Sequence, residues 1–216
     1  MTMFRHGAAL LLLMLCGCAG SLLAPPRPVV LYRLEGAATT PPIPQLAIEQ
    51  RQSVHLTIGF ASEIDGDRLL TVRGPRAMYL KSARWISPVP DLFRKGIEQA
   101  FARRAPLVML YPVRPPANFG YRFELRIDHF EAVYADVATA DAPPIVRLDG
   151  EARLLRRDGT EPLAVWALAA HARAKENSVG AIVEAFGVAA DRCFDETADK
   201  TAGLIAGALR ENGPAR

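Results

Sequence analysis

This chain of 216 residues has three cysteines, whose thiols can take part in several kinds of chemistry. A thiol can act as a nucleophile, bind a metal, form a disulfide or accept a lipid. Cys16 and Cys18 close an apolar run near the N-terminus, whereas Cys193 lies beside Phe194 in a stretch with helical periodicity. For Cys193 we expect a small buried hydrophobic side chain in preference to a reactive nucleophile.

The first 18 residues, MTMFRHGAALLLLMLCGC, have the layout of an export signal. A short basic region precedes an apolar core of about eight residues, which is too short for the roughly 20 that span a membrane. The run ends in Leu15-Cys16-Gly17-Cys18, which resembles the bacterial lipobox. The lipobox places cleavage between Gly17 and Cys18 and a diacylglyceryl group on the Cys18 thiol. We therefore predict that residues 1–17 are a lipoprotein signal peptide.

Two other interpretations of this segment are weaker. Cleavage after Ala24 would put Pro25 directly behind the cut, where signal peptidases work poorly. Lipid on Cys16 would put the bulky Leu15 in the position that needs a small residue. Cys18 is therefore the preferred lipidation site.

Acylation of Cys18 would fix the protein to a membrane. Mature bacterial lipoproteins usually carry three acyl chains, such as palmitate, on this cysteine, and each buried methylene contributes about 0.8 kcal/mol. Ala19 stands where lipoproteins of the inner membrane typically have Asp. In a host with two membranes, the expected location is the outer membrane, facing the periplasm. Cys193 would then have no partner for an intramolecular disulfide.

Composition favours one folded domain that does not bind nucleic acid. Half of the residues are apolar, which permits a substantial core and argues against global disorder. The formal net charge is only +3, and the basic residues are interspersed with acidic ones. Residues 18–52 are predicted to be the lipidated cysteine, a Pro-rich tether and a short first strand. Residues 53–211 are predicted to be the main domain, and 212–216 a flexible C-terminus.

Runs of alternating apolar and polar residues predict several strands. The alternation in residues 121–127 is clean, and its phase slips near His129, which indicates a bulge. The continuous apolar run 107–113 is expected to be a buried strand. Gly74-Pro75 and residues 157–160 have the composition of turns. The other strands are expected at residues 29–34, 54–60, 69–72, 77–85, 146–154 and 163–172.

Two stretches have helical periodicity. The first begins near Ser87, which can cap the helix, and ends at Pro106. The second runs from about Ser178 to Arg210, with a stripe of small and apolar residues at every third or fourth position. The order of strands, helix, strands and helix predicts a single α+β domain. Its sheet would be mixed or antiparallel, with the two main helices packed on one face.

No catalytic or metal-binding motif is recognisable in the main domain. His55, His129 and His171 have none of the HExxH, HxH or CxxC spacings of metal sites, and there is no GxSxG or Walker motif. Asp65 and Asp67 fit a solvated turn. We therefore expect that the protein is not an enzyme and has no metal and no cofactor. A solvated helix face is the expected place of the three clustered acids Asp195, Glu196 and Asp199.

Five cations lie within one predicted hairpin and are the best candidates for a contact surface. Near anionic lipid each surface cation contributes about 1 kcal/mol, so a lipid headgroup or a protein partner would suit this surface. The alternative is that these strand positions simply face solvent. The candidate contact residues, with the tryptophan that ends the hairpin, are Arg68, Arg73, Arg76, Lys81, Arg84 and Trp85.

Several segments together resemble one known family. They are the lipobox, the short strand with Tyr32-Arg33-Leu34, the hairpin end Ala83-Arg84-Trp85-Ile86-Ser87-Pro88 and the strand YRFELRI at residues 121–127. An amphipathic helix follows the hairpin. This order is similar to that of the ABC-type transport auxiliary lipoproteins, the PqiC-like family, over nearly all of the mature chain.

The resemblance implies a non-catalytic role at the outer membrane. Proteins of this family look like outer-membrane partners of MCE-domain (mammalian-cell-entry) proteins and their ABC transporters, which move lipids across the envelope. The implied function is an auxiliary component of such a lipid transport system, docked to its periplasmic assembly. The sheet edge and the cationic hairpin are the expected contact surfaces.

Two alternatives stay open. An envelope-assembly lipoprotein could bind cell-wall enzymes or outer-membrane machinery through a similar domain. A lipid-anchored hydrolase is disfavoured because the sequence has no recognisable nucleophile–base pair.

Overall fold

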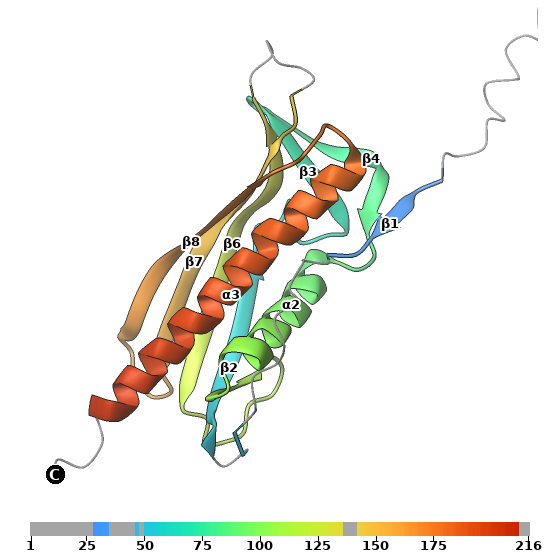
Figure 1. Cartoon of the computed structure of the whole chain (residues 1–216). Coiled ribbons are helices and arrows are strands. Elements are labelled where there is room, and N and C mark those ends of the chain that lie inside the picture. The colour runs from blue at the N-terminus through green and yellow to red at the C-terminus, as the bar shows by residue number, and fades with distance from the viewer. Residues whose placement is uncertain (1–27, 35–45, 48–49, 136–141, 212–216) are drawn as a thin grey trace, which may run out of the picture.

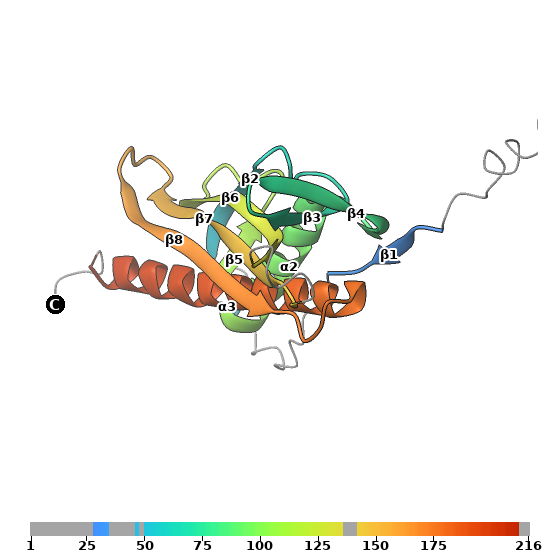
Figure 2. The same ribbon diagram turned by 90° about the horizontal axis from the view of Figure 1, so that it is seen from above.

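The computed structural model describes residues 28–34, 46–47, 50–135 and 142–211. Gly17 and Cys18, the rest of the predicted signal, most of the predicted tether and residues 212–216 lie outside the described residues. Within the described residues, eight strands form one mixed sheet, and two helices lie on one of its faces (Figures 1 and 2). The prediction of a single α+β domain with a mixed sheet is confirmed.

The sheet is organised around its longest described strand, β6 (Tyr121–Tyr134). β7 (Ile145–Arg156) pairs antiparallel along one side of β6. On the other side, β2 (Gln52–Phe60) pairs parallel with the first half of β6, and β3 (Arg68–Arg73) pairs parallel with its end. The register of β6 against β7 shifts directly after Ile127, so the bulge predicted near His129 is confirmed.

Four further strands complete the sheet. β4 (Arg76–Trp85) pairs antiparallel with β3, and Gly74 adopts a φ of 53° in the turn between them, which glycine accommodates without strain. β1 (Val30–Tyr32) pairs parallel with β4. β8 (Pro162–Arg173) pairs antiparallel with β7, and β5 (Val108–Tyr111) pairs parallel with β2. The strands at the edges are therefore β1, β5 and β8.

β5 corrects one prediction from the sequence. The apolar run 107–113 predicts a buried strand, but β5 is shorter than this run and lies at an edge of the sheet. Only Val108 of the strand is buried. An edge strand has a neighbour on one side only, and Pro112, which has no N–H to donate, follows β5 directly.

Helix α2 (Val89–Arg104) follows β4 and ends before Pro106, as predicted. Pro88 is the N-cap residue and no side chain makes a capping hydrogen bond, so the prediction that Ser87 caps the helix is wrong. A proline in the first turn removes one N–H that would otherwise need an acceptor, which lowers the need for a cap. The buried face carries the apolar residues at helical spacing, Val89, Phe93, Ile97, Ala100 and Phe101.

Helix α3 (Val179–Glu211) crosses the same face of the sheet (Figure 1). At its start, the hydroxyl of Ser178 accepts a hydrogen bond of 3.3 Å from the backbone N–H of Ala181. The predicted stripe of small and apolar residues is buried from Ile182 to Ala208. Small side chains along this stripe let a long helix lie close to the sheet.

An aromatic cluster joins the helices to the sheet. The ring of Phe130 in β6 has its centroid 4.9 Å from that of Phe93 in α2 and 4.7 Å from that of Phe186 in α3. Trp85, the last residue of β4, meets Phe186 edge-on at 5.4 Å. Such aromatic pairs contribute about 0.5–1.5 kcal/mol each beyond their burial. The cluster therefore fixes β4, β6 and both helices relative to one another.

The two helices approach each other closely at Gly96 of α2. A Cβ atom at Gly96 would lie 2.3 Å from Cε2 of Phe194 on α3, a separation that real contacts essentially never show. The Phe194 ring in turn packs edge-on against Phe93 at 5.1 Å. Glycine costs about 1 kcal/mol relative to alanine inside a helix, so packing is the reason for its place here.

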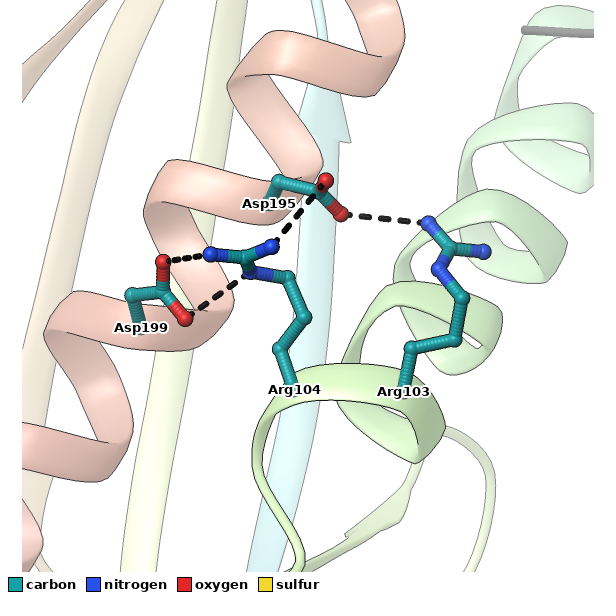
Figure 3. Close-up of polar contacts among 4 residues, drawn as sticks. All are labelled: Arg103, Arg104, Asp195 and Asp199. Carbon is teal, nitrogen blue, oxygen red and sulfur yellow. Dashed lines mark hydrogen bonds and ion pairs between the residues drawn. The ribbon is translucent and has the colours of Figure 1, made fainter. Parts of the chain in front are cut away.

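Ion pairs join the end of α2 to α3 (Figure 3). Arg103 Nη2 lies 3.1 Å from Asp195 Oδ1, and Arg104 Nε donates a hydrogen bond of 2.9 Å to Asp199 Oδ1. Arg104 Nη1 also lies 3.6 Å from Asp195 Oδ2. The prediction of a solvated face is therefore wrong for Asp195, which is partly buried between the two arginines, but Glu196 and Asp199 are exposed. The periodicity of one helix does not reveal which residues face it from another.

Replacing Gly96 with Ala tests the close helix contact. The added methyl group must displace the Phe194 ring, so we expect the free energy of unfolding to fall by about 1–3 kcal/mol. Gly203→Ala is the matched control, since Gly203 also lies within a helix but a Cβ there meets nothing within 4 Å. The control should gain up to about 1 kcal/mol from helix propensity. Urea unfolding followed by circular dichroism measures both variants, and equal effects would contradict the packing role of Gly96.

Candidate functional site

The described histidines do not come together as a metal or catalytic site. His55 of β2 lies against the ring of Phe119, at 5.8 Å between centroids. His171 Nε2 lies 3.3 Å from the carboxylate of Asp149, and Arg147 Nε lies 3.4 Å from the same carboxylate. The positive charge beside Asp149 is therefore already supplied by the Arg147 guanidinium. In the part of the chain that the structure describes, no group of three or more His, Cys, Asp or Glu side chains could hold a metal ion.

Cys193 is buried in α3, as expected from the sequence. Burial raises the pKa of its thiol to about 12, with a hydrogen bond to Thr197 acting in the opposite direction. The reactive form of cysteine is the thiolate. The thiol of Cys193 therefore stays protonated near neutral pH and is not available as a nucleophile.

A cavity of about 800 Å³ lies beside α2 and is also bordered by α3 and by the residues after β1. Its lining is rich in charged side chains of both signs, including Arg94, Glu98 and Asp191. Among the described residues that line this cavity there is no histidine or cysteine, so they supply no imidazole base or thiol nucleophile for acyl transfer.

The predicted contact cations form two opposed pairs and a single residue on the hairpin of β3 and β4. Arg68 is the register partner of Arg84 at the base of the hairpin, and Arg73 is the partner of Arg76 beside the turn. Lys81 lies between the pairs, where the register of β4 against β3 is irregular. Like charges directly opposite each other destabilise an antiparallel pair. We call residues 68–85 the cationic hairpin.

Three of these cations have neighbours that offset part of the repulsion. Arg84 Nη1 lies 2.7 Å from Asp67 Oδ1. The guanidinium of Arg68 lies 3.7 Å from the ring centroid of Tyr79, and that of Arg73 lies 4.8 Å from the ring centroid of Tyr134. Exposed cation–π contacts of this kind contribute about 0.5–1 kcal/mol each. These contacts therefore hold the three guanidinium groups against the fold.

Arg76 and Lys81 are exposed and extend from β4. Met78 lies between them in the sequence and is 59% exposed. An exposed apolar side chain flanked by cations is suited to a partner that presents both acidic and apolar groups. This part of the cationic hairpin is the most available for contact.

Trp85 does not lie on this surface. Its side chain is 2% exposed, and its ring stacks on Phe130 at 6.1 Å between centroids. The prediction that Trp85 contacts a partner directly is therefore wrong. At the end of β4, Ala83 and Trp85 are buried while Arg84 between them is partly exposed, so the tryptophan anchors the hairpin to the core.

The N-terminal part of the described chain is attached to the cationic hairpin. β1 pairs parallel with residues 83–85 of β4, at the base of the hairpin. The sequence predicts this strand but not its partner, because three residues contain too little pattern to specify a register. No helix among the described residues is both long and apolar enough to cross a membrane.

No family model matches the chain, and no curated protein matches it. Among solved structures, a DUF330-family protein from Xanthomonas campestris is similar with a TM-score of 0.65 and 16% identity, over 84% of this chain and 99% of that one. An uncharacterised protein matches with a TM-score of 0.61 and 10% identity, over 83% of this chain and 99% of its own.

A hypothetical protein from Chlamydia trachomatis is also similar, with a TM-score of 0.51 and 10% identity, over 73% of this chain and 99% of that one. At such low sequence identities, the similarity shows a shared fold and nothing further. Nearly the whole length of each of these proteins is matched, so the domain described here corresponds to a complete unit in them. The chain therefore has the α+β fold of the DUF330-family protein from Xanthomonas campestris.

Proposed function

We propose that the protein is a non-catalytic lipoprotein that serves as an auxiliary component of an MCE/ABC-type lipid transport system. It is anchored in the outer membrane through a lipid on Cys18, faces the periplasm, and docks the periplasmic assembly of the transporter. The observation that carries the proposal is a lipobox in front of a domain with the fold of a DUF330 protein, a group that corresponds to the PqiC-like family.

The position of β1 supports a contact role for the cationic hairpin. The segment from Cys18 to Val30 spans at most about 40 Å when it is fully extended. Because β1 pairs with residues 83–85, the base of the hairpin is held within about this distance of the proposed lipid anchor. A partner that reaches the inner surface of the outer membrane would therefore meet the cationic hairpin close to the membrane.

The charges of the hairpin indicate the chemistry of the partner. Opposed arginine pairs lose part of their repulsion when an acidic surface comes between or over them. Arg76 and Lys81 are exposed, and Met78 offers an apolar contact beside them. We assign this surface to an acidic, partly apolar face of an MCE-domain protein or an ABC transporter subunit.

Replacing Cys18 with Ala tests the anchor. The variant has no thiol at the proposed lipidation site, so it should incorporate no labelled palmitate and should leave the membrane fraction. Cys16→Ala is the matched control, because it removes the neighbouring thiol and leaves Gly17-Cys18 intact. Fractionation and labelling in cells measure both variants. Membrane association that survives in Cys18→Ala would refute the anchor.

Reversing two charges tests the docking surface. In the double variant Arg76→Glu/Lys81→Glu, acidic residues replace the two exposed cations, and recovery of transporter subunits with the full-length protein from membranes should fall at least tenfold, about 1.4 kcal/mol. The double variant Arg114→Glu/Arg210→Glu makes the same change in net charge at exposed positions outside the hairpin. It should recover the same subunits as the wild type.

The identity of the recovered proteins separates the two candidate functions. An envelope-assembly lipoprotein would use the same anchor, but it would recover cell-wall enzymes or outer-membrane machinery. Recovery of those proteins in the absence of MCE and transporter subunits would overturn the proposed function. Equal losses in the two double variants would instead exclude the cationic hairpin as the specific contact.

A further inference from the structure

β1 carries apolar side chains on both of its faces, and both faces are exposed. Register partners in adjacent parallel strands point to the same face of a sheet. Val30 therefore lies on the face of the buried Ala83, and Leu31 lies on the opposite face. Together with Val29 they are between 46% and 58% exposed. A continuous apolar run is typical of a strand that is covered on both faces, whereas a strand with one face in water alternates apolar and polar residues.

A fourth exposed apolar side chain adjoins β1. The backbone N–H of Ile86, directly after β4, donates a hydrogen bond of 2.8 Å to the carbonyl oxygen of Tyr32. Ile86 is also about half exposed. Exposed apolar residues that gather in one place mark contacts with a membrane or a partner. We call the four exposed residues Val29, Val30, Leu31 and Ile86 the β1 patch.

The β1 patch lacks the protection that an edge strand usually has. Among the described strands, β1 pairs only with β4, and it lies at the outer end of the sheet (Figures 1 and 2). Edge strands normally carry charges or bulges on their open side. No charged residue occurs from Val29 to Tyr32. The strand therefore has the sequence of a covered element without a cover in the described part of the chain.

The proposed lipid on Cys18 decides which surface covers this patch. Val29 lies at most about 40 Å from Cys18, even when the chain between them is fully extended. Two linked groups associate as if at high effective concentration, so a small apolar area can bind when it is tethered to its target. A second copy of the chain or a protein partner would have to arrive by diffusion. The membrane that holds the acyl chains is always within reach.

We propose that the β1 patch inserts into the lipid surface in which Cys18 is anchored. The inference rests on the proposed anchor and adds a second membrane contact to it. The side chains of the patch would lie at the boundary between headgroups and acyl chains, about 5–10 Å deep. The backbone groups on the open side of β1 set this limit, because they have no hydrogen-bond partner in hydrocarbon.

Insertion would leave the proposed protein contact free. The patch adjoins the base of the cationic hairpin, where β1 pairs with residues 83–85. Arg76 lies at the other end of β4, beside the turn. The lipid surface and a protein partner would therefore contact different parts of the same hairpin.

A fluorescent label at Leu31 tests the insertion. The full-length Leu31→Cys variant, purified with its own lipid, is labelled with the environment-sensitive dye NBD and placed in vesicles of phosphatidylethanolamine and phosphatidylglycerol. The buried Cys193 should not react with the dye. We expect blue-shifted emission and at least about threefold stronger quenching by spin-labelled lipid than in the control. Val113→Cys is the matched control, since it is 81% exposed and lies just after β5, at the opposite end of the strand order from β1.

A charge variant tests the patch with the label outside β1. Ile86→Cys carries the dye, and Val29→Asp/Leu31→Asp adds two carboxylates to the patch, so quenching should fall to the level of the first control. Leu163→Asp/Val165→Asp makes the same change at exposed apolar positions of β8 and should leave the quenching unchanged. Because Val29 and Leu31 are exposed, thermal unfolding should match that of the wild type. If the variant failed to fold, the label at Leu31 would still decide the question.

The outcomes separate this inference from the proposed function. A labelled protein that does not float with the vesicles would overturn both, because the lipid anchor itself would be missing. A protein that floats, but whose label at Leu31 is quenched no more than the label at Val113, would overturn the inference alone. A blue-shifted Leu31 label that the spin-labelled lipid does not quench would show that a second copy covers the patch, and would likewise overturn it.

Discussion

The bulge in β6 is the constraint on which the rest of the sheet depends. The extra residue after Ile127 lets both Ile127 and Phe130, an odd number of positions apart, be buried in the core. Gly150 of β7 lies opposite, and a Cβ there would be 2.0 Å from the carbonyl oxygen of Arg126. The two backbones can approach this closely only with glycine. The bulge thus separates the part of β6 that pairs with β2 from the part that pairs with β3.

The candidate contact surface follows from this division. β3 pairs with the end of β6, and β4 pairs with β3, so the end of β6 sets the position of the cationic hairpin. Trp85 returns the hairpin to the core by packing on Phe130 and Phe186. The surface cations therefore extend from a hairpin that Trp85 anchors to the core.

Periodicity predicted the elements well because it reports which face of a strand or helix is buried. It gave the bulge near His129 and the buried stripes of both helices. It did not show which elements pack or pair with one another. The edge position of β5, the burial of Trp85 and the pairing of Asp195 with Arg103 all depend on neighbours that are distant in the sequence. The resemblance of residues 15–18 to a lipobox can be recognised from the sequence alone, because a lipobox is a local motif.

The short pairing of β1 with β4 has a consequence for how far the domain could reach from the proposed lipid on Cys18. While the three register pairs hold, the extended tether ends at Val30. Three pairs at a sheet edge are among the first contacts to open in a folded protein. If they open, the next strand of the sheet begins at Gln52, and a fully extended chain from Cys18 to Gln52 measures about 110 Å. The domain would then have two maximum distances from the membrane: a shorter one while β1 is paired with β4, and a longer one when this pairing is open.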